Sequence, residues 1–122
     1  MKKGKPSITK KNETVRSKSE KRIADALFDL NISYEYETPI YMNGVQVHPD
    51  FYLINYGIFV EFWGLVKFED YRRTMVFKKS QYSAHKVKVI HVYPYHLTRG
   101  EDYLKNYLVT CLKKMIPRGY YG

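Results

Sequence analysis

Three acidic residues have the types and spacing that could hold a divalent cation. Asp50 follows Pro49 at the start of an apolar run, and Glu61 lies 61 − 50 = 11 positions later, within the apolar residues 58–63. Glu20 stands further upstream, in a segment with helical spacing. A carboxylate in an apolar stretch is costly to bury unless it is paired, hydrogen-bonded or bound to a metal. Oxygen ligands suit Mg²⁺, with Mn²⁺ as a substitute, and such an ion supports hydrolysis of phosphodiesters.

The residues around Asn55-Tyr56-Gly57 predict a hairpin that brings Asp50 and Glu61 together. Two apolar runs, residues 51–54 and 58–62, flank this turn. A loop of two or four residues pairs positions whose numbers sum to 111, as 50 + 61 does, and a three-residue loop shifts the register by one. In either case we expect the two carboxyl groups within about 5–8 Å if they share a face. That separation allows a shared cation.

Glu20 heads the apolar stripe of a predicted amphipathic helix that begins near Ser17 and ends near Asn31. It precedes Ile23 and Leu27 by three and seven positions, so its side chain turns toward the interior. Ser17-x-x-Glu20 is also a capping box, in which the glutamate at the third helical position bonds back to the cap backbone. Capping and membership of the acidic cluster are therefore two open interpretations, and they are compatible.

The remaining pattern predicts a single α/β domain over residues 13–122, with a central mixed sheet flanked by helices. Residues 1–12 are rich in lysine and poor in apolar side chains, which predicts a flexible basic arm. The arm either grips phosphates or only adds solubility. Asn43-Gly44 predicts a tight hairpin turn. The other predicted elements are strands at 32–38, 40–42, 45–47 and 87–93 and helices at 68–85 and 100–115.

The charge of the chain favours a polyanionic partner. Lys and Arg number 21 against 12 Asp and Glu, giving a net charge of +9 and a pI near 9.5. Nucleic acid or an anionic surface would attract such a protein. No apolar run approaches the roughly 18 residues of a membrane span, so we expect no membrane partner and an intracellular location, cytoplasmic or nucleoid-associated, or in a host cell if the protein is viral. The single cysteine excludes an internal disulfide and a zinc finger.

These residues resemble the PD-(D/E)XK nuclease superfamily over roughly residues 17–93. The resemblance implies a restriction-endonuclease-like αβββαβ core, here followed by a C-terminal helix. It implies that Asp50 and Glu61 hold one or two Mg²⁺ ions, with Glu20 as a ligand directly or through water. The backbone carbonyl of Phe62 would be a further ligand.

The chain departs from the superfamily pattern at Trp63, which replaces the lysine of the Glu-x-Lys motif. Lys78-x-x-x-Tyr82 on the next predicted helix looks like the motif by which some members bring a lysine and a tyrosine into the site. Lys78 is therefore the expected relocated lysine, with Lys67 and Lys79 as the next candidates. Alternatively, Lys78 is one solvated cation among many on a basic helix. Four residues at successive spacings of four, three and four share one face of this helix: Tyr71, Met75, Lys78 and Tyr82.

The resemblance implies a Mg²⁺-dependent DNA endonuclease, in which Glu20, Asp50, Glu61 and Lys78 are catalytic. The alternative is a DNA-binding module that kept the scaffold and lost activity, and a third interpretation is a basic structural protein of a nucleoprotein particle. Cleavage of both strands by so small a domain would need a homodimer or two binding events. His48, Trp63 and Tyr82 are expected to line the site, although His48 also fits a surface loop. The cations expected at DNA phosphates are Arg16, Lys18, Arg72, Arg73 and Lys79.

Overall fold

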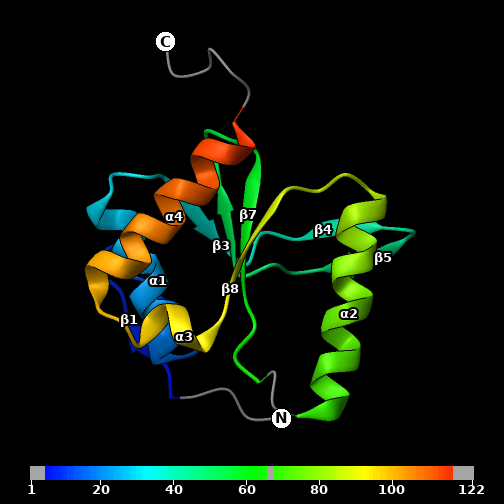
Figure 1. The fold of residues 1–122 in the computed structure, drawn as a ribbon, viewed down its shortest axis with the longest axis horizontal. Coiled ribbons are helices and arrows are strands. Elements are labelled where there is room, and N and C mark those ends of the chain that lie inside the picture. The colour runs from blue at the N-terminus through cyan, green and yellow to red at the C-terminus, as the bar shows by residue number, and fades with distance from the viewer. Residues whose placement is uncertain (1–4, 66–67, 117–122) are drawn as a thin grey trace. The chain divides into compact units, whose positions relative to one another are not determined.

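The computed structural model describes residues 5–65 and 68–116, and its arrangement of elements is shown in Figure 1. Within these ranges the chain is mixed α/β, as predicted, with eight strands and four helices. It divides into two compact units: one combines the residues up to Tyr34 with those from Tyr95 onward, and the other is Glu35–Pro94. The elements are β1 (Ser7–Ile8), β2 (Thr14–Val15), α1 (Lys18–Asp29), β3 (Tyr34–Tyr36), β4 (Ile40–Met42), β5 (Val45–Val47), β6 (Phe51–Leu53), β7 (Ile58–Phe62), α2 (Glu69–Ala84), β8 (Val89–Val92), α3 (Pro94–Leu97) and α4 (Glu101–Met115).

A four-stranded mixed sheet in the order β3-β6-β7-β8 organises the Glu35–Pro94 unit. β6 runs antiparallel to β7, and β7 runs parallel to β8. Phe51 pairs with Val60 and Leu53 pairs with Ile58, so the paired numbers sum to 111. Of the two registers that the turn allowed, this is the one expected for a loop of two or four residues. β7 is inside the sheet and nearly all of it is buried, which is why its sequence is almost continuously apolar.

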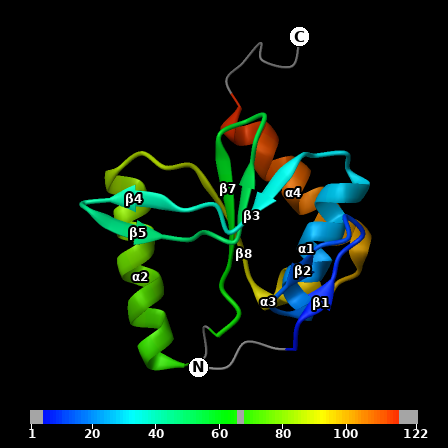
Figure 2. The ribbon, with the colours of Figure 1, turned by 180° about the vertical axis from the view of Figure 1, so that it is seen from behind.

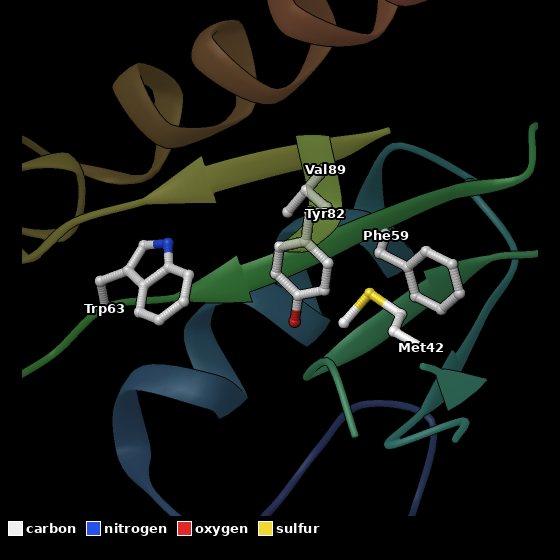
Figure 3. Packing of buried hydrophobic residues seen from close by; sticks show 5 residues of the cluster. All are labelled: Met42, Phe59, Trp63, Tyr82 and Val89. Atoms are coloured by element: carbon white, nitrogen blue, oxygen red, sulfur yellow. The ribbon is translucent and has the colours of Figure 1, made fainter. Parts of the chain in front are cut away.

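One face of this sheet packs against α2 and the β4–β5 hairpin. Figure 3 shows the ring of Tyr82, from α2, between Trp63 on one side and Phe59 and Met42 on the other, with Val89 of β8 completing the cluster. Burying these five side chains removes a large apolar surface from water, which fixes α2 over the end of β7. The helix therefore presents one face to the strand that carries Glu61.

The β4–β5 hairpin turns at Asn43 and Gly44, whose φ angles of 52° and 75° lie in the left-handed region that this dipeptide tolerates. The predicted turn is therefore confirmed. The Asn43 amide donates to the Gln81 side chain on α2 at 3.1 Å. This bond and the packing of Met42 hold the hairpin beside the helix, as both ribbon views show (Figures 1 and 2).

In the other unit, α1 packs against α4 and against the β1–β2 hairpin, as Figure 2 shows from behind. Ile23 and Leu27 are completely buried on α1, which confirms the predicted stripe. The helix ends before Asn31, whose φ of 60° ends the helical path. Residues 18–29 thus form the amphipathic helix that the spacing predicted.

The described part of the segment predicted as a flexible arm contains regular structure. Ser7 pairs with Val15 across the short β1–β2 hairpin. Lys10 lies 2.9 Å from Asp29 through its ammonium group and donates its backbone N–H to Asp25 at 2.8 Å. The strand is too short for its alternation to be recognised in the sequence. The acidic partners of Lys10 on α1 lie 15 and 19 positions away in the sequence, so local composition does not reveal them.

No helix among the described residues has the length and apolar character needed to cross a bilayer. The structure also contains α3, which the sequence did not predict because a four-residue helix is shorter than the window in which helical periodicity is detected.

Candidate functional site

Asp50 and Glu61 occupy facing positions at one end of the β6–β7 hairpin. The register that pairs Phe51 with Val60 places Asp50 opposite Glu61 at the next step, and facing residues of antiparallel strands project to the same side. Both side chains are buried, with exposed fractions of 3% and 4%. The hairpin therefore delivers two carboxylates to one interior position, as its turn predicted.

The Asp50 carboxylate is held by the backbone of the neighbouring strand. Its Oδ2 atom accepts the N–H of Phe62 at 2.7 Å. The Asp50 carbonyl accepts the N–H of Glu37 at 2.9 Å, which ties the residue to the end of β3 as well. The Phe62 carbonyl, expected as a further metal ligand, accepts the Tyr71 hydroxyl at 3.4 Å. Asp50 is thus fixed in orientation by main-chain groups on both sides.

Glu61 is held by two side chains from α2. The Tyr82 hydroxyl donates to Oε2 at 2.5 Å, and the Lys78 ammonium lies 3.4 Å from the same oxygen. A buried carboxylate needs such partners because water no longer solvates its charge. The face of α2 predicted from its spacing of four, three and four is therefore the face that meets the sheet, and it brings Lys78 to Glu61.

The two carboxylates act together on the neighbouring tyrosines. Burial, followed by the charges of Asp50 and Glu61, raises the pKa of Tyr71 to about 12. Burial and Glu61, with a smaller effect from Asp50, raise the pKa of Tyr82 far above its ordinary value. Both hydroxyls therefore stay protonated and donate hydrogen bonds. Both carboxylates therefore act on the same two hydroxyls.

Trp63 lies two positions after Glu61 and forms one wall of the site. Its indole Nε1–H donates to His91 Nδ1 at 2.8 Å. The ammonium groups of Lys78 and Lys79 lie 5.3 and 5.9 Å from the indole centroid. Burial and the charge of Lys79 lower the pKa of His91 to about 4, so its ring is neutral at physiological pH and can accept a hydrogen bond from the indole N–H.

Glu20 belongs to the other unit, at the third position of α1. Ser17 Oγ accepts the Glu20 N–H at 3.1 Å, and the Ser17 hydroxyl donates to Glu20 Oε1 at 3.2 Å. The predicted N-cap at Ser17 is confirmed. The Glu20 carboxylate bonds to the serine hydroxyl, and its predicted bond to the cap backbone stays a prediction. Its exposed fraction of 1% also agrees with the inward orientation expected from the stripe. A metal-binding role for Glu20 stays a prediction.

The remaining predicted residues are on the surface or at its edge. His48 is exposed between β5 and β6, and Lys79 is half-buried beside Trp63, where it hydrogen-bonds to the Tyr93 hydroxyl. Lys67 lies outside the described residues. Contacts of these residues with substrate stay predictions. The exposed cations of the expected DNA-binding set are Arg16, Lys18, Arg72 and Arg73.

The donors at the site fit a hard divalent cation. In the part of the chain that the structure describes, no three His, Cys, Asp or Glu side chains form a metal-binding group. Mg²⁺, however, is commonly held by one or two carboxylates, with water and substrate phosphate completing the shell. Asp50, Glu61 and the Phe62 carbonyl supply only oxygen. Two carboxylates against one lysine leave a net negative charge, which a cation would offset.

Two contributors to the site were not among the predicted site residues. Tyr71 shares its helix face with Lys78, so the helical spacing had indicated its position without a role. His91 faces Glu61 across the parallel β7–β8 pair. No turn sets that register, because a helix connects the two strands, so local sequence does not indicate it.

The arrangement thus combines a buried carboxylate pair, a lysine at hydrogen-bonding range of one carboxylate, and two tyrosine hydroxyls that remain protonated. A group of this composition could bind a cation and stabilise negative charge developing on a bound phosphate. Comparisons of the chain with protein-family models, with curated proteins and with solved structures gave no match.

Proposed function

We propose that this chain is a Mg²⁺-dependent DNA endonuclease built on a restriction-endonuclease-like core of the PD-(D/E)XK type. The observation that supports it most is the position of Lys78, whose ammonium lies 3.4 Å from Glu61 Oε2. This lysine comes from α2 and replaces the charge missing at Trp63, directly after β7. Because Asp50 faces Glu61 on the same side of the hairpin, the two acids and the lysine of the proposed reaction belong to one site.

Each residue has a distinct role in the proposed reaction. Asp50 and Glu61, with the Phe62 carbonyl, would hold the metal ion. Bound Mg²⁺ would polarise the scissile phosphate and lower the pKa of a water molecule. Lys78 offsets the negative charge that develops on the phosphate, and needs no reorganisation because it is already in place. Tyr82 holds Glu61 in one orientation through its short hydrogen bond.

DNA is the proposed substrate because the chain carries a net charge of +9, which favours a polyanion. Arg72 and Arg73 are exposed on the same helix as Lys78. Cations on this helix would place phosphates close to the carboxylate pair. The proposal for DNA therefore depends on charge and position together.

Cleavage of supercoiled, linear and branched DNA with Mg²⁺ or Mn²⁺ tests this proposal. Asp50→Asn and Lys78→Met should each slow cleavage by about 10²–10³-fold, because each removes a preorganised charge. Thr74→Ala, at an exposed neutral position of the same helix, is the control and should retain the rate.

Equal rates for Asp50→Asn and the unmodified protein would rule out this site. Binding of DNA by the unmodified protein without cleavage of any substrate would support the alternative, a DNA-binding module that lacks activity.

A further inference from the structure

We infer that Trp63 and His91 are positioning residues that direct the Lys78 ammonium onto Glu61. The catalytic consequence rests on the proposed function, whereas the positioning itself is a property of the folded chain. Trp63 stands where the resembled motif has its lysine, and by this inference it orients the lysine supplied by α2.

Lys78 has two partners that restrict its side chain. Its ammonium lies 3.4 Å from Glu61 Oε2 and 5.3 Å from the centroid of the Trp63 ring. A cation within about 6 Å of an indole face is attracted by the ring quadrupole, most strongly where water is excluded. A lysine with four flexible carbons would otherwise populate many rotamers. The indole thus favours the rotamers that reach Glu61.

The indole is itself fixed. Trp63 is 2% exposed, and its backbone N–H donates to the Val92 carbonyl at 2.8 Å, extending the parallel β7–β8 pairing. His91 accepts the indole N–H at 2.8 Å, and the two ring planes lie within 26° of each other with their centroids 6.0 Å apart. Tyr71 contacts the indole edge-on at 6.3 Å. These contacts prevent the ring from turning away from α2.

His91 can hold the indole only while Nδ1 has a lone pair. Because Nδ1 accepts a hydrogen bond from the indole N–H, the neutral ring carries its own proton on Nε2. The neighbouring Lys79 is held at Tyr93, whose ring centroid lies 4.8 Å from the Lys79 ammonium. Lys79 thus has a partner of its own, and the ammonium that pairs with Glu61 is that of Lys78.

A direct test is the NMR signal of the Lys78 εCH₂ group in protein labelled with ¹³C-lysine. Lys78→Met assigns this signal, and the Trp63 ring current should shift it upfield. Trp63→Phe should keep part of the shift because it retains a ring, and Trp63→Leu should abolish it. Phe59→Leu removes an aromatic ring from the same core cluster, so it is the matched control and should leave the signal in place.

An unchanged Lys78 signal in Trp63→Leu would overturn the inference. If that variant does not fold, the emission of the single tryptophan decides instead. Lys78→Met should change the Trp63 emission, because it removes a charge next to the ring. Identical emission spectra in the two proteins would contradict the contact.

Cleavage kinetics test the consequence for the proposed reaction. Trp63→Leu should lower kcat by about tenfold to a hundredfold with little change in KM, because a misplaced group costs rate rather than binding. Trp63→Phe should recover most of the rate. In the Lys78→Met background, Trp63→Leu should have no further effect, as expected for two residues acting through one group.

Additive effects in this double-mutant cycle would show that Trp63 does not act through Lys78. Absence of any cleavage by the unmodified protein would contradict the proposed function alone, and the NMR and emission results would then decide the positioning by themselves.

Discussion

Asp50 Oδ2 accepts the backbone N–H of Phe62 at 2.7 Å, just beyond the last backbone pair of the β6–β7 hairpin, that of Phe51 with Val60. Hydrogen bonds to an ionised carboxylate are shorter and stronger than neutral ones. The bond therefore continues the hairpin register into the candidate site and fixes the acid next to Glu61. The first part of the site is thus built into the hairpin, and α2 adds Lys78 and Tyr82.

The hydroxyl of Tyr82 should contribute more to stability than that of Tyr71. Tyr82→Phe should lower the free energy of unfolding by about 1.5–3 kcal/mol, because it removes a buried hydrogen bond to a charged carboxylate. Tyr71→Phe is the matched control and should cost less than about 1 kcal/mol, since its hydroxyl lies 3.4 Å from its neutral acceptor. Urea unfolding followed by circular dichroism measures both. Equal destabilisation in the two variants would contradict the strong Tyr82–Glu61 bond.

Variants at Ser17 and Glu20 distinguish the capping of α1 from the predicted metal-binding role of Glu20. Ser17→Ala should lower the free energy of unfolding by about 1 kcal/mol through removal of the N-cap, and should leave Mn²⁺ affinity unchanged. If Glu20 contributes to the metal site, as the resemblance implies, Glu20→Gln should weaken Mn²⁺ binding in calorimetry. Unchanged Mn²⁺ affinity in Glu20→Gln would remove this residue from the expected ligand set.

Arg72 and Arg73 should contribute to DNA affinity through phosphates rather than bases. Replacing both with alanine should weaken binding of unrelated duplexes to a similar degree. The slope of log Kd against log salt concentration should fall by about one for each phosphate that an arginine no longer neutralises. Fluorescence anisotropy over a salt series measures this slope, with Thr74→Ala at an exposed neutral position of α2 as control. An unchanged slope would exclude both arginines from the DNA-binding surface.

His91 should make the folded state less stable in mild acid. Its folded pKa of about 4 lies below the ordinary value of 6.5, so between these pH values the unfolded chain binds a proton that folded His91 does not. Stability should therefore fall as pH falls from about 6.5 toward 4. His91→Gln cannot titrate and should lose less stability over that window.

Melting temperatures of the two proteins across this pH range measure the difference. The pKa of His96 is also lowered by burial, but His96 is present in both proteins, so its effect cancels in the comparison. Parallel dependence of the two melting temperatures on pH would show that His91 is not held neutral by the fold.

The sequence predicted the elements whose signals are local. The apolar stripe of α1, the Asn43-Gly44 turn and the helical face of α2 each depend on residues within a few positions of one another, and all three were confirmed. The Asn55-Tyr56-Gly57 turn limited the hairpin to two registers one residue apart, because a short loop sets which residues face each other, and either register brings the two acids close. Asp50 and Glu61 could therefore be placed together in advance.

Tertiary structure alone decided how the other parts of the site meet. The sequence offered Lys78 with Lys67 and Lys79 as alternatives, and the packing of Tyr82 into the core cluster brought Lys78 to Glu61. His91 reached Trp63 through the parallel β7–β8 register, which a helical connection leaves open and side-chain packing must set. Local periodicity determines which face of an element is apolar, whereas the burial of that face against a distant segment determines which polar groups become neighbours.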